Sequence, residues 1–273
     1  MGLIQFDQRR TRQPQFASVV DWGNPLTAGL VSLINPATGL ELVSRSRVTE
    51  NGSIVKSASK LGRTVAASAN GGAAAIAGNA TGVTTGPLTD FVFVDSAVIV
   101  GGSSFLYACG TYDGGSNGCG ITIEHGTISN RWGAVDIGSN LTNSLASSEE
   151  QCPLDGGFLV HTRDGTTHRL YRNGVLKASV AGTSGNASSS AKFVACNLVA
   201  TGGTFSTIAP IALAGRFNRK LSDSEVSQLS ANPWQLFAPR RIWVPVSAAS
   251  GPPTLAAIAA SNMTTSGARL TVT

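Results

Sequence analysis

Residues 210–246 constrain the fold more than any other stretch of this sequence. They open with an apolar run, 211–217, that suits a buried strand. Ser222 then stands three residues before Glu225, which is the spacing of a capping box in which each side chain satisfies a free backbone N–H of the other residue. We therefore predict a strand that leads directly into a short helix over 222–231.

The flanking residues fix both ends of this predicted helix. Leu221 and Val226 are placed to form a hydrophobic staple across the cap. Asn232 suits the left-handed residue that ends many helices, and Pro233 prevents the helix from continuing. An apolar closing strand along the body of the fold is predicted to follow, with Trp234, Leu236, Phe237, Ile242 and Trp243 as its apolar residues.

The composition favours many short strands joined by turns of small residues. Gly accounts for 32 of the 273 residues, and only 13% of the residues are charged. Helical bundles do not have such a composition. With 42% hydrophobic residues, the chain can bury a sizeable core as one large domain or as two smaller ones. We predict an all-β fold.

A second informative stretch is 158–179, FLVHTRDGTTHRLYRNGVLKAS. The dipeptides DG at 164–165 and NG at 173–174 are strong signals for tight turns between strands. A two-residue turn at 173–174 pairs Tyr171 with Leu176, so the hairpin has one apolar side. We expect that side to be buried and to consist of Tyr171, Leu176, Ala178 and Val180.

Further apolar runs predict the remaining strands. The continuous run 91–100, FVFVDSAVIV, suits a strand that is buried on both faces. The segment 40–86 contains only weak, short strands, and we interpret its region ANGGAAAIAGNATGVTTG (69–86) as surface loops. Other strands are predicted at 30–34, 53–57, 63–68, 105–109, 121–125, 131–137 and 192–200.

Two of these stretches resemble a known family. RFNRKLSDSEVSQL (216–229) and the DG–LYRNG hairpin are similar to LamG-like (concanavalin A-like) jelly rolls, and NPWQLFAPRRI (232–242) resembles the tail that these domains carry in tailed-bacteriophage and prophage proteins. The resemblance spans most of residues 20–246. It implies an antiparallel two-sheet jelly roll over 21–246, in a non-enzymatic virion protein of a tail or baseplate fibre or of a capsid decoration.

The two ends of the chain are interpreted as assembly arms. Residues 1–20 are polar and rich in arginine, which fits a loosely ordered terminus or an arm that docks on a neighbouring subunit. Residues 247–273 join a linker to a segment that resembles the start of a fibronectin-like module, and they are either disordered or add a strand to another chain's sheet. The arm residues are Phe6, Arg9, Arg10, Arg12, Leu270 and Val272.

Charge and hydropathy argue against several kinds of partner. The net charge of +5 is modest and lacks the basic stripe of nucleic-acid-binding proteins. No apolar run reaches the roughly 18 residues that span a bilayer, and no secretory signal is evident. We therefore expect assembly in the host cytoplasm into a virion, with other virion proteins and further copies of this chain as partners, and neither nucleic acid nor membrane insertion.

The sequence shows no catalytic motif. The alternating carboxylates that concanavalin-like glucanases use are missing, as are the G-x-S-x-G elbow and the P-loop. His161 and His168 flank a turn and would lie on neighbouring strands, where we interpret them as structural residues. Without C-x-x-C spacing, the cysteines are interpreted as buried free thiols, and a Cys109–Cys119 disulfide is disfavoured in a reducing cytosol. The four cysteines are Cys109, Cys119, Cys152 and Cys196.

A carbohydrate-binding adhesion module that recognises host surface glycans is the alternative function. Sugar sites offer an aromatic ring and polar side chains, and the candidates are Trp132 with the adjacent Arg131, and Tyr112 in its Gly-rich loop. No cofactor is expected. Some LamG-like domains bind calcium at a rim, but the aspartates here are scattered singly, so Asp113 is only the first residue to test for Ca²⁺.

Overall fold

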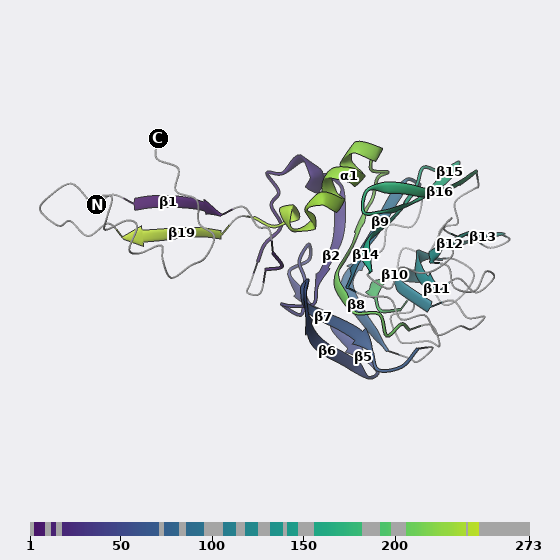
Figure 1. Ribbon diagram of the computed structural model, residues 1–273, viewed down its shortest axis with the longest axis horizontal. Coiled ribbons are helices and arrows are strands. Elements are labelled where there is room, and N and C mark those ends of the chain that lie inside the picture. Colours follow the sequence, from purple (N-terminus) through teal and green to yellow (C-terminus); the bar gives the residue numbers. More distant parts are fainter. Residues whose placement is uncertain are drawn as a thin grey trace, which may run out of the picture.

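The structure is a computed structural model. It describes residues 3–8, 12–14, 18–70, 74–81, 86–95, 106–112, 118–124, 132–138, 141–146, 156–181, 192–197, 206–238 and 240–245. Within these ranges two antiparallel sheets face each other across an apolar core (Figure 1). The predicted all-β, two-sheet antiparallel sandwich with one short helix is confirmed.

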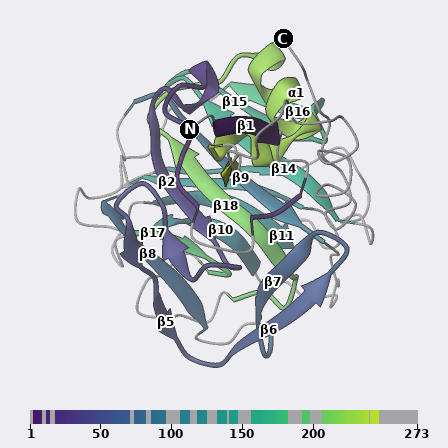
Figure 2. The same ribbon diagram turned by 90° about the vertical axis from the view of Figure 1, so that its left-hand side faces the viewer.

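The larger sheet has ten strands, and its central strand β18 (Ile211–Phe217) comes from the stretch that dominates the sequence. Figure 2 shows the middle strands of this sheet side by side. Its main path runs in the order β16 (Val175–Ala181), β15 (Thr167–Arg172), β14 (Gly157–Arg163), β9 (Leu88–Val94), β18, β2 (Leu30–Asn35), β3 (Leu40–Glu41), β4 (Ser46–Arg47), and β7 (Gly62–Ala67) with β6 (Ile54–Ser59) joins at β18.

The smaller sheet has seven strands and lies against the other face of the core. The strands predicted from the apolar runs are confirmed here too, with ends that differ by a few residues. The order is β13 (Leu141–Ala146), β12 (Gly133–Gly138), β11 (Gly118–Glu124), β10 (Leu106–Tyr112), β17 (Lys192–Ala195), β8 (Ala75–Thr81), β5 (Thr49–Asn51).

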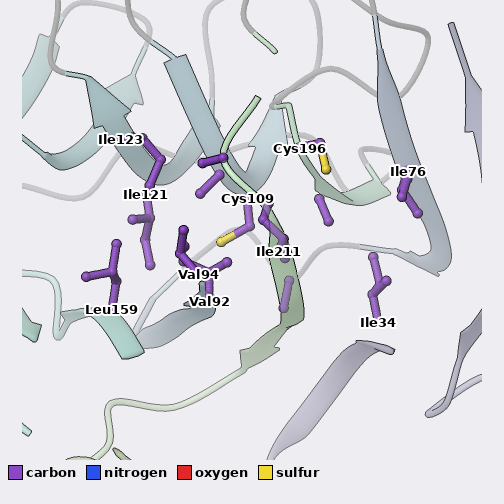
Figure 3. Close-up of a cluster of buried hydrophobic side chains, with 14 of the residues drawn as sticks. Ile34, Ile76, Val92, Val94, Cys109, Ile121, Ile123, Leu159, Cys196 and Ile211 are labelled. Carbon is purple, nitrogen blue, oxygen red and sulfur yellow. The ribbon is translucent and has the colours of Figure 1, made fainter. Parts of the chain in front are cut away.

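Strand β9 connects two separate apolar clusters, as expected for a strand buried on both faces. Val92 and Val94 point into the cluster between the two sheets (Figure 3). Phe91 and Phe93 alternate with them and pack on the opposite side of the larger sheet, where Phe91 stacks on Phe158 with ring centroids 5.5 Å apart. The larger sheet therefore has no solvated face at its centre.

The helix α1 (Asp223–Ala231) covers the second cluster. Its N-cap is Ser222, and both hydrogen bonds of the capping box to Glu225 are present. Leu221, Val226 and Leu229 are buried against the sheet. The predicted helix, its cap and the burial of both staple residues are confirmed.

The predicted left-handed end of the helix is wrong, because Asn232 has φ −149°. The chain continues instead into a 3₁₀ helix, η2 (Pro233–Leu236). The side chain of Gln235 donates from its Nε2 to the carbonyl oxygens of Gln228 at 2.7 Å and Asn232 at 2.8 Å. These bonds satisfy carbonyls at the helix end that a left-handed turn would otherwise satisfy.

The turn at Asn173-Gly174 is confirmed, with φ values of 50° and 81°. Both are positive, as a type I′ hairpin turn requires. Of its predicted apolar side, Tyr171 is buried and Ala178 is partly buried, but the expected burial of Leu176 and Val180 is wrong, since they are 46% and 39% exposed. The reason is that β16 is the edge strand of the sheet and extends beyond the cover of α1.

The region 75–81, interpreted from sequence as surface loop, is instead a strand of the smaller sheet, and residues 75–77 are buried. Small side chains here permit a close approach between the sheets. A Cβ at Gly78 would lie 2.9 Å from the Cγ of Glu41 and 3.4 Å from the carbonyl oxygen of Phe193. The low-complexity composition reflects this packing constraint.

The predicted closing strand along the body is also wrong. Strand β19 (Arg240–Pro245) pairs with β1 (Leu3–Gln8) in a two-stranded antiparallel sheet, with Phe6 opposite Ile242. Figure 1 shows this sheet beside the sandwich. β1 matches β19 in length, so it supplies a full ladder of backbone hydrogen bonds from the opposite end of the chain.

Among the helices of the described residues, none is long and apolar enough to cross a membrane. Beside α1 and η2 they include one further 3₁₀ turn, η1 (Pro25–Thr27), which Asn24 caps by accepting from the backbone N–H of Leu26.

Candidate functional site

Residues 216–225, which we call the latch, connect parts of the sandwich to one another rather than forming a surface site. Arg216 is fully buried between the sheets, where its Nε and Nη2 donate to the two carboxylate oxygens of Asp90 at 2.6 and 2.9 Å. Its Nη1 donates to the Oγ1 of Thr111 on the opposite sheet at 2.6 Å. Burial alone would lower the pKa of Arg216, but the Asp90 carboxylate raises it above its usual value. The guanidinium therefore stays charged and ties the two layers together.

Two further side chains of the latch close the end of the sandwich. Lys220 donates to Asp164 in the β14–β15 turn at 2.6 Å, and this bond holds the pKa of Asp164 well below its usual range. Arg219 pairs with Glu225 at 2.8 Å, which lowers the pKa of Glu225 to about 2. The helix end, the turn and the central strand thus form one linked unit.

A second buried polar cluster lies between β12, β14 and β15. Arg163 donates to Asp136 at 2.6 Å, and the rings of His161 and His168 stack with 3.2 Å between Nε2 of His161 and Nδ1 of His168. Burial lowers the pKa of both imidazoles, and for His161 the neighbouring His168 adds to the effect. All four side chains are buried. The interpretation of the two histidines as structural residues agrees with this geometry.

Among the residues that the structure describes, no group of three or more His, Cys, Asp or Glu side chains could hold a metal ion. Asp113, the position named for Ca²⁺, lies outside them. Cys109, Cys119 and Cys196 are buried free thiols, as predicted, and burial raises the pKa of Cys119 to about 11 and that of Cys196 to about 12. Cys152 lies outside the described residues.

Of the three predicted glycan-binding residues, the structure describes Trp132 and Tyr112. Trp132 has no exposed surface and belongs to the core cluster between the sheets, so its ring cannot stack on a sugar in this conformation. Tyr112 is half-buried at the end of β10, and Arg131 lies outside the described residues. Of the predicted arm residues, Phe6 lies on β1 and Arg12 is exposed, whereas Arg9, Arg10, Leu270 and Val272 are not described.

Gln13, inside the predicted N-terminal arm, is built into the body of the fold. It is buried, and its amide nitrogen donates to the carbonyl oxygens of Arg63 at 2.8 Å and Ala212 at 2.9 Å. Its Oε1 accepts the backbone N–H of Arg63 at 2.6 Å. Gln13 is therefore held in place on the larger sheet by hydrogen bonds to β7 and β18.

Beside Gln13 the surface is hollowed into a half-open cavity of ≈ 550 Å³. Its walls come from the segment 12–13, the β6–β7 turn at 59–62, Phe93 of β9, and the end of α1 with the start of η2, 230–234. The rings of Phe93 and Trp234 lie 5.8 Å apart at 44° and form an aromatic wall. This volume is within the range of about 300–1,000 Å³ that holds small ligands.

Polar groups of different kinds border the same cavity. Arg12 and Lys60 are exposed cations on two of its walls. The hydroxyl oxygen of Ser230 is buried and makes no hydrogen bond in the structure. An aromatic wall, a hydroxyl without a partner and two cations make this cavity the candidate binding site.

Sequence reasoning missed this site, although it named two of its members for other reasons. Trp234 was assigned to the core and Arg12 to an arm. Trp234 is 5% exposed and does belong to the cluster under α1, yet it also borders the cavity. The lining comes from four segments up to 222 residues apart, which no local spacing rule connects.

No protein-family model and no curated protein matches the sequence. Among solved structures, the fold resembles domain 4 of AbnA, a GH43 extracellular arabinanase from Geobacillus stearothermophilus, in complex with arabinotriose. The TM-score is 0.55 at 13% identity, over 74% of this chain and 98% of that chain. Two further similar structures are the binding domain of Paraclostridial Mosquitocidal Protein 1 (TM-score 0.53, 14% identity, 75% of this chain and 52% of that one) and the botulinum neurotoxin serotype G binding domain (TM-score 0.53, 14% identity, 74% and 50%).

This chain spans about half the length of each of these two toxin domains. At such low identity these similarities establish the β-sandwich fold and nothing about the site, because one fold serves many functions.

Proposed function

We propose that the protein is a non-catalytic, carbohydrate-binding β-sandwich that is displayed on a tailed-phage virion. The cavity beside α1 is the observation on which the binding function rests. It offers Trp234 and Phe93 as an apolar surface for a sugar ring and the Ser230 hydroxyl as a hydrogen-bonding partner for a sugar hydroxyl. The arabinotriose complex of a similar sandwich domain supports the same class of ligand.

The absence of catalysis is part of this proposal. The buried carboxylates Asp90 and Asp136 face arginines at 2.6 Å. Glu41, also buried, accepts the backbone N–H groups of Leu33, Val43 and Ser44. Carboxylates committed in this way are poor general acids or nucleophiles, because both roles need a free oxygen that faces the substrate.

The binding function is tested with Ser230→Ala on an array of host-surface oligosaccharides. Removal of a buried hydroxyl that has no partner leaves stability unchanged or raises it by about 1 kcal/mol. If a ligand hydroxyl uses this oxygen, the variant binds its glycans several-fold more weakly while its melting temperature stays the same or rises. Equal glycan binding by the variant and the wild type contradicts the assignment of the cavity, and no binding by the wild type contradicts the function.

The virion role rests on the resemblance of residues 216–229 and 232–242 to phage LamG-like proteins. In this role the chain assembles in the host cytoplasm, joins other virion proteins and further copies of itself, and is anchored by its two terminal segments. The test compares particles made with the full chain, with a chain that lacks 1–8, and with a chain that lacks 247–273. We expect reduced incorporation for at least one truncation, and undiminished incorporation of both would reject anchoring by the ends.

A further inference from the structure

The charge of the cavity lining is one-sided. Among the described residues that line it, Arg12 and Lys60 are the ionisable ones, and none of the lining residues that the structure describes is acidic. Within the described residues Arg12 forms no ion pair or hydrogen bond, so none of them compensates its charge. Lys56, on β6 four residues before Lys60, differs in this respect, since it pairs with Glu50 at 2.7 Å. A hollow with uncompensated positive charge concentrates anions.

Capping of α1 is the structural alternative for these two cations, because the end of α1 forms one wall of the cavity. The helix has no basic residue in its last turn. Its end is nevertheless capped, since the side chain of Gln235 and the backbone N–H of Asn232 both donate to the carbonyl oxygen of Gln228. The partial charge of a helix end is about −0.5, which two full positive charges exceed. The helix end therefore does not account for the charge of Arg12.

We propose that the cavity takes an acidic saccharide, whose sugar ring lies against Trp234 and Phe93 and whose negatively charged substituent is held by Arg12 and Lys60. This inference rests on the carbohydrate-binding function proposed above and adds the charge of the ligand to it. An arginine can hold a carboxylate or a phosphate group through two parallel hydrogen bonds. The buried Ser230 hydroxyl, between the aromatic wall and the helix end, is left for a sugar hydroxyl.

The experiment measures by calorimetry the affinity of the full chain for digalacturonate, for neutral galactobiose and for galactose 6-phosphate, at about 50 and 300 mM salt. We expect the two anionic sugars to bind at least tenfold more tightly than galactobiose at the lower salt concentration, with a smaller difference at the higher one. The phosphate and carboxylate probes show which anion the cation pair prefers. Inorganic phosphate serves as the control for charge without a sugar.

Arg12→Gln and Lys60→Gln each remove one cation from an exposed position, so both variants should fold normally. Each is expected to reduce the affinity for the anionic sugars by fivefold or more and to leave galactobiose unaffected. Lys56→Gln is the matched control, because it removes the same charge from the same hairpin outside the cavity and should change neither affinity.

The outcomes separate this inference from the function beneath it. Equal affinity for anionic and neutral sugars, or an equal effect of Arg12→Gln and Lys56→Gln, overturns the acidic ligand and leaves a neutral saccharide site. Inorganic phosphate that binds as tightly as the anionic sugars shows an adventitious ion only, and also overturns the inference. No binding of any of these sugars together with no signal on the glycan array overturns the proposed function itself.

Discussion

Arg216 carries its charge between two sheets, where an unpaired guanidinium would cost several kcal/mol. The structure meets that cost with two hydrogen bonds to Asp90 and one to Thr111. The same stretch of sequence supplies Phe217 to the cluster on the other side of the sheet, so alternate residues of β18 serve opposite faces. At the scale of single residues, Arg216 and Phe217 thus act through buried contacts on opposite faces of the larger sheet.

We expect Arg216→Met to destabilise the fold by about 3–5 kcal/mol, because it leaves the Asp90 carboxylate buried without its partner. Asp90→Leu should have a similar effect for the converse reason. The double variant removes both charges and should be more stable than either single variant. Urea unfolding of the three proteins gives these values, and additive losses in the double variant would show that the two side chains do not act as a pair.

The histidine pair makes stability depend on pH in a defined window. Burial lowers the pKa of His161 and His168 in the folded state, whereas in the unfolded chain both titrate near about 6.5. Below that pH the unfolded state binds more protons than the folded state, so the free energy of unfolding falls as the pH is lowered. The charged groups that act on the pair are Arg163 and Arg216 for His161, and Asp136, Arg163 and Asp164 for His168.

Urea unfolding at pH 8 and pH 5.5 measures this effect. Asp164 and Glu225 do not titrate between these pH values, because the fold lowers the pKa of both carboxyl groups below its ordinary value. We expect a clear loss of stability at pH 5.5 in the wild type. The variant that carries both His161→Gln and His168→Gln should lose most of this pH dependence. An unchanged dependence in that variant would assign the effect to other groups.

At the scale of elements, α1 is short, and its cap therefore matters to its formation. Nine residues are too few for a stable isolated helix, so the capping box and the burial of Val226 and Leu229 hold it in place. We predict that Ser222→Ala costs about 1 kcal/mol of stability. Ser227→Ala, at an exposed position inside the same helix, is the control and should change little, as thermal or urea unfolding can show.

The two hairpin turns, at Gly165 and Gly174, differ in whether they contact α1. Gly174 has φ +81°, and a Cβ there would lie 3.0 Å from the Cα of Ser227 in α1, whereas a Cβ at Gly165, φ +96°, would meet nothing within 4 Å. Both Gly→Ala variants carry the backbone strain of about 1–2 kcal/mol. Gly174→Ala should therefore lower the unfolding free energy more than Gly165→Ala does. Equal losses would show that the turn and the helix do not press on each other.

Sequence patterns correctly predicted those structural elements that depend only on residues close together in the sequence. The capping box, the staple and the NG turn each depend on residues within five positions of one another, and all three are present. The strand at 75–81 was missed because Gly78 within it packs closely against Glu41 and Phe193, which lie far away in the sequence. The cavity was missed for the same reason: Arg12, Lys60, Phe93 and Trp234 meet only when the fold is complete.

At the scale of the whole molecule, Gln13 separates the terminal strand from the body. Four of its hydrogen bonds reach Asn35, Arg63 and Ala212, which belong to β2, β7 and β18. We predict that removal of residues 1–8 leaves the unfolding free energy of the sandwich nearly unchanged. Removal of 1–14, or Gln13→Ala in the full chain, should lower it by about 1–3 kcal/mol, because buried amide and carbonyl groups lose their partners. Denaturation of the four proteins tests this order.

Arg12 and Gln13 line the hollow beside α1, and they stand only a few residues after the strand that pairs with β19. The N-terminal segment thus pairs with β19 through β1 and lines the cavity through Arg12 and Gln13. A partner that binds β1 and displaces Arg12 and Gln13 would change the affinity of the cavity for its ligand. By the same coupling, a ligand that contacts both Arg12 and Lys60 would oppose that displacement. The proposed attachment through β1 and the proposed recognition in the cavity would therefore depend on the same short stretch of chain.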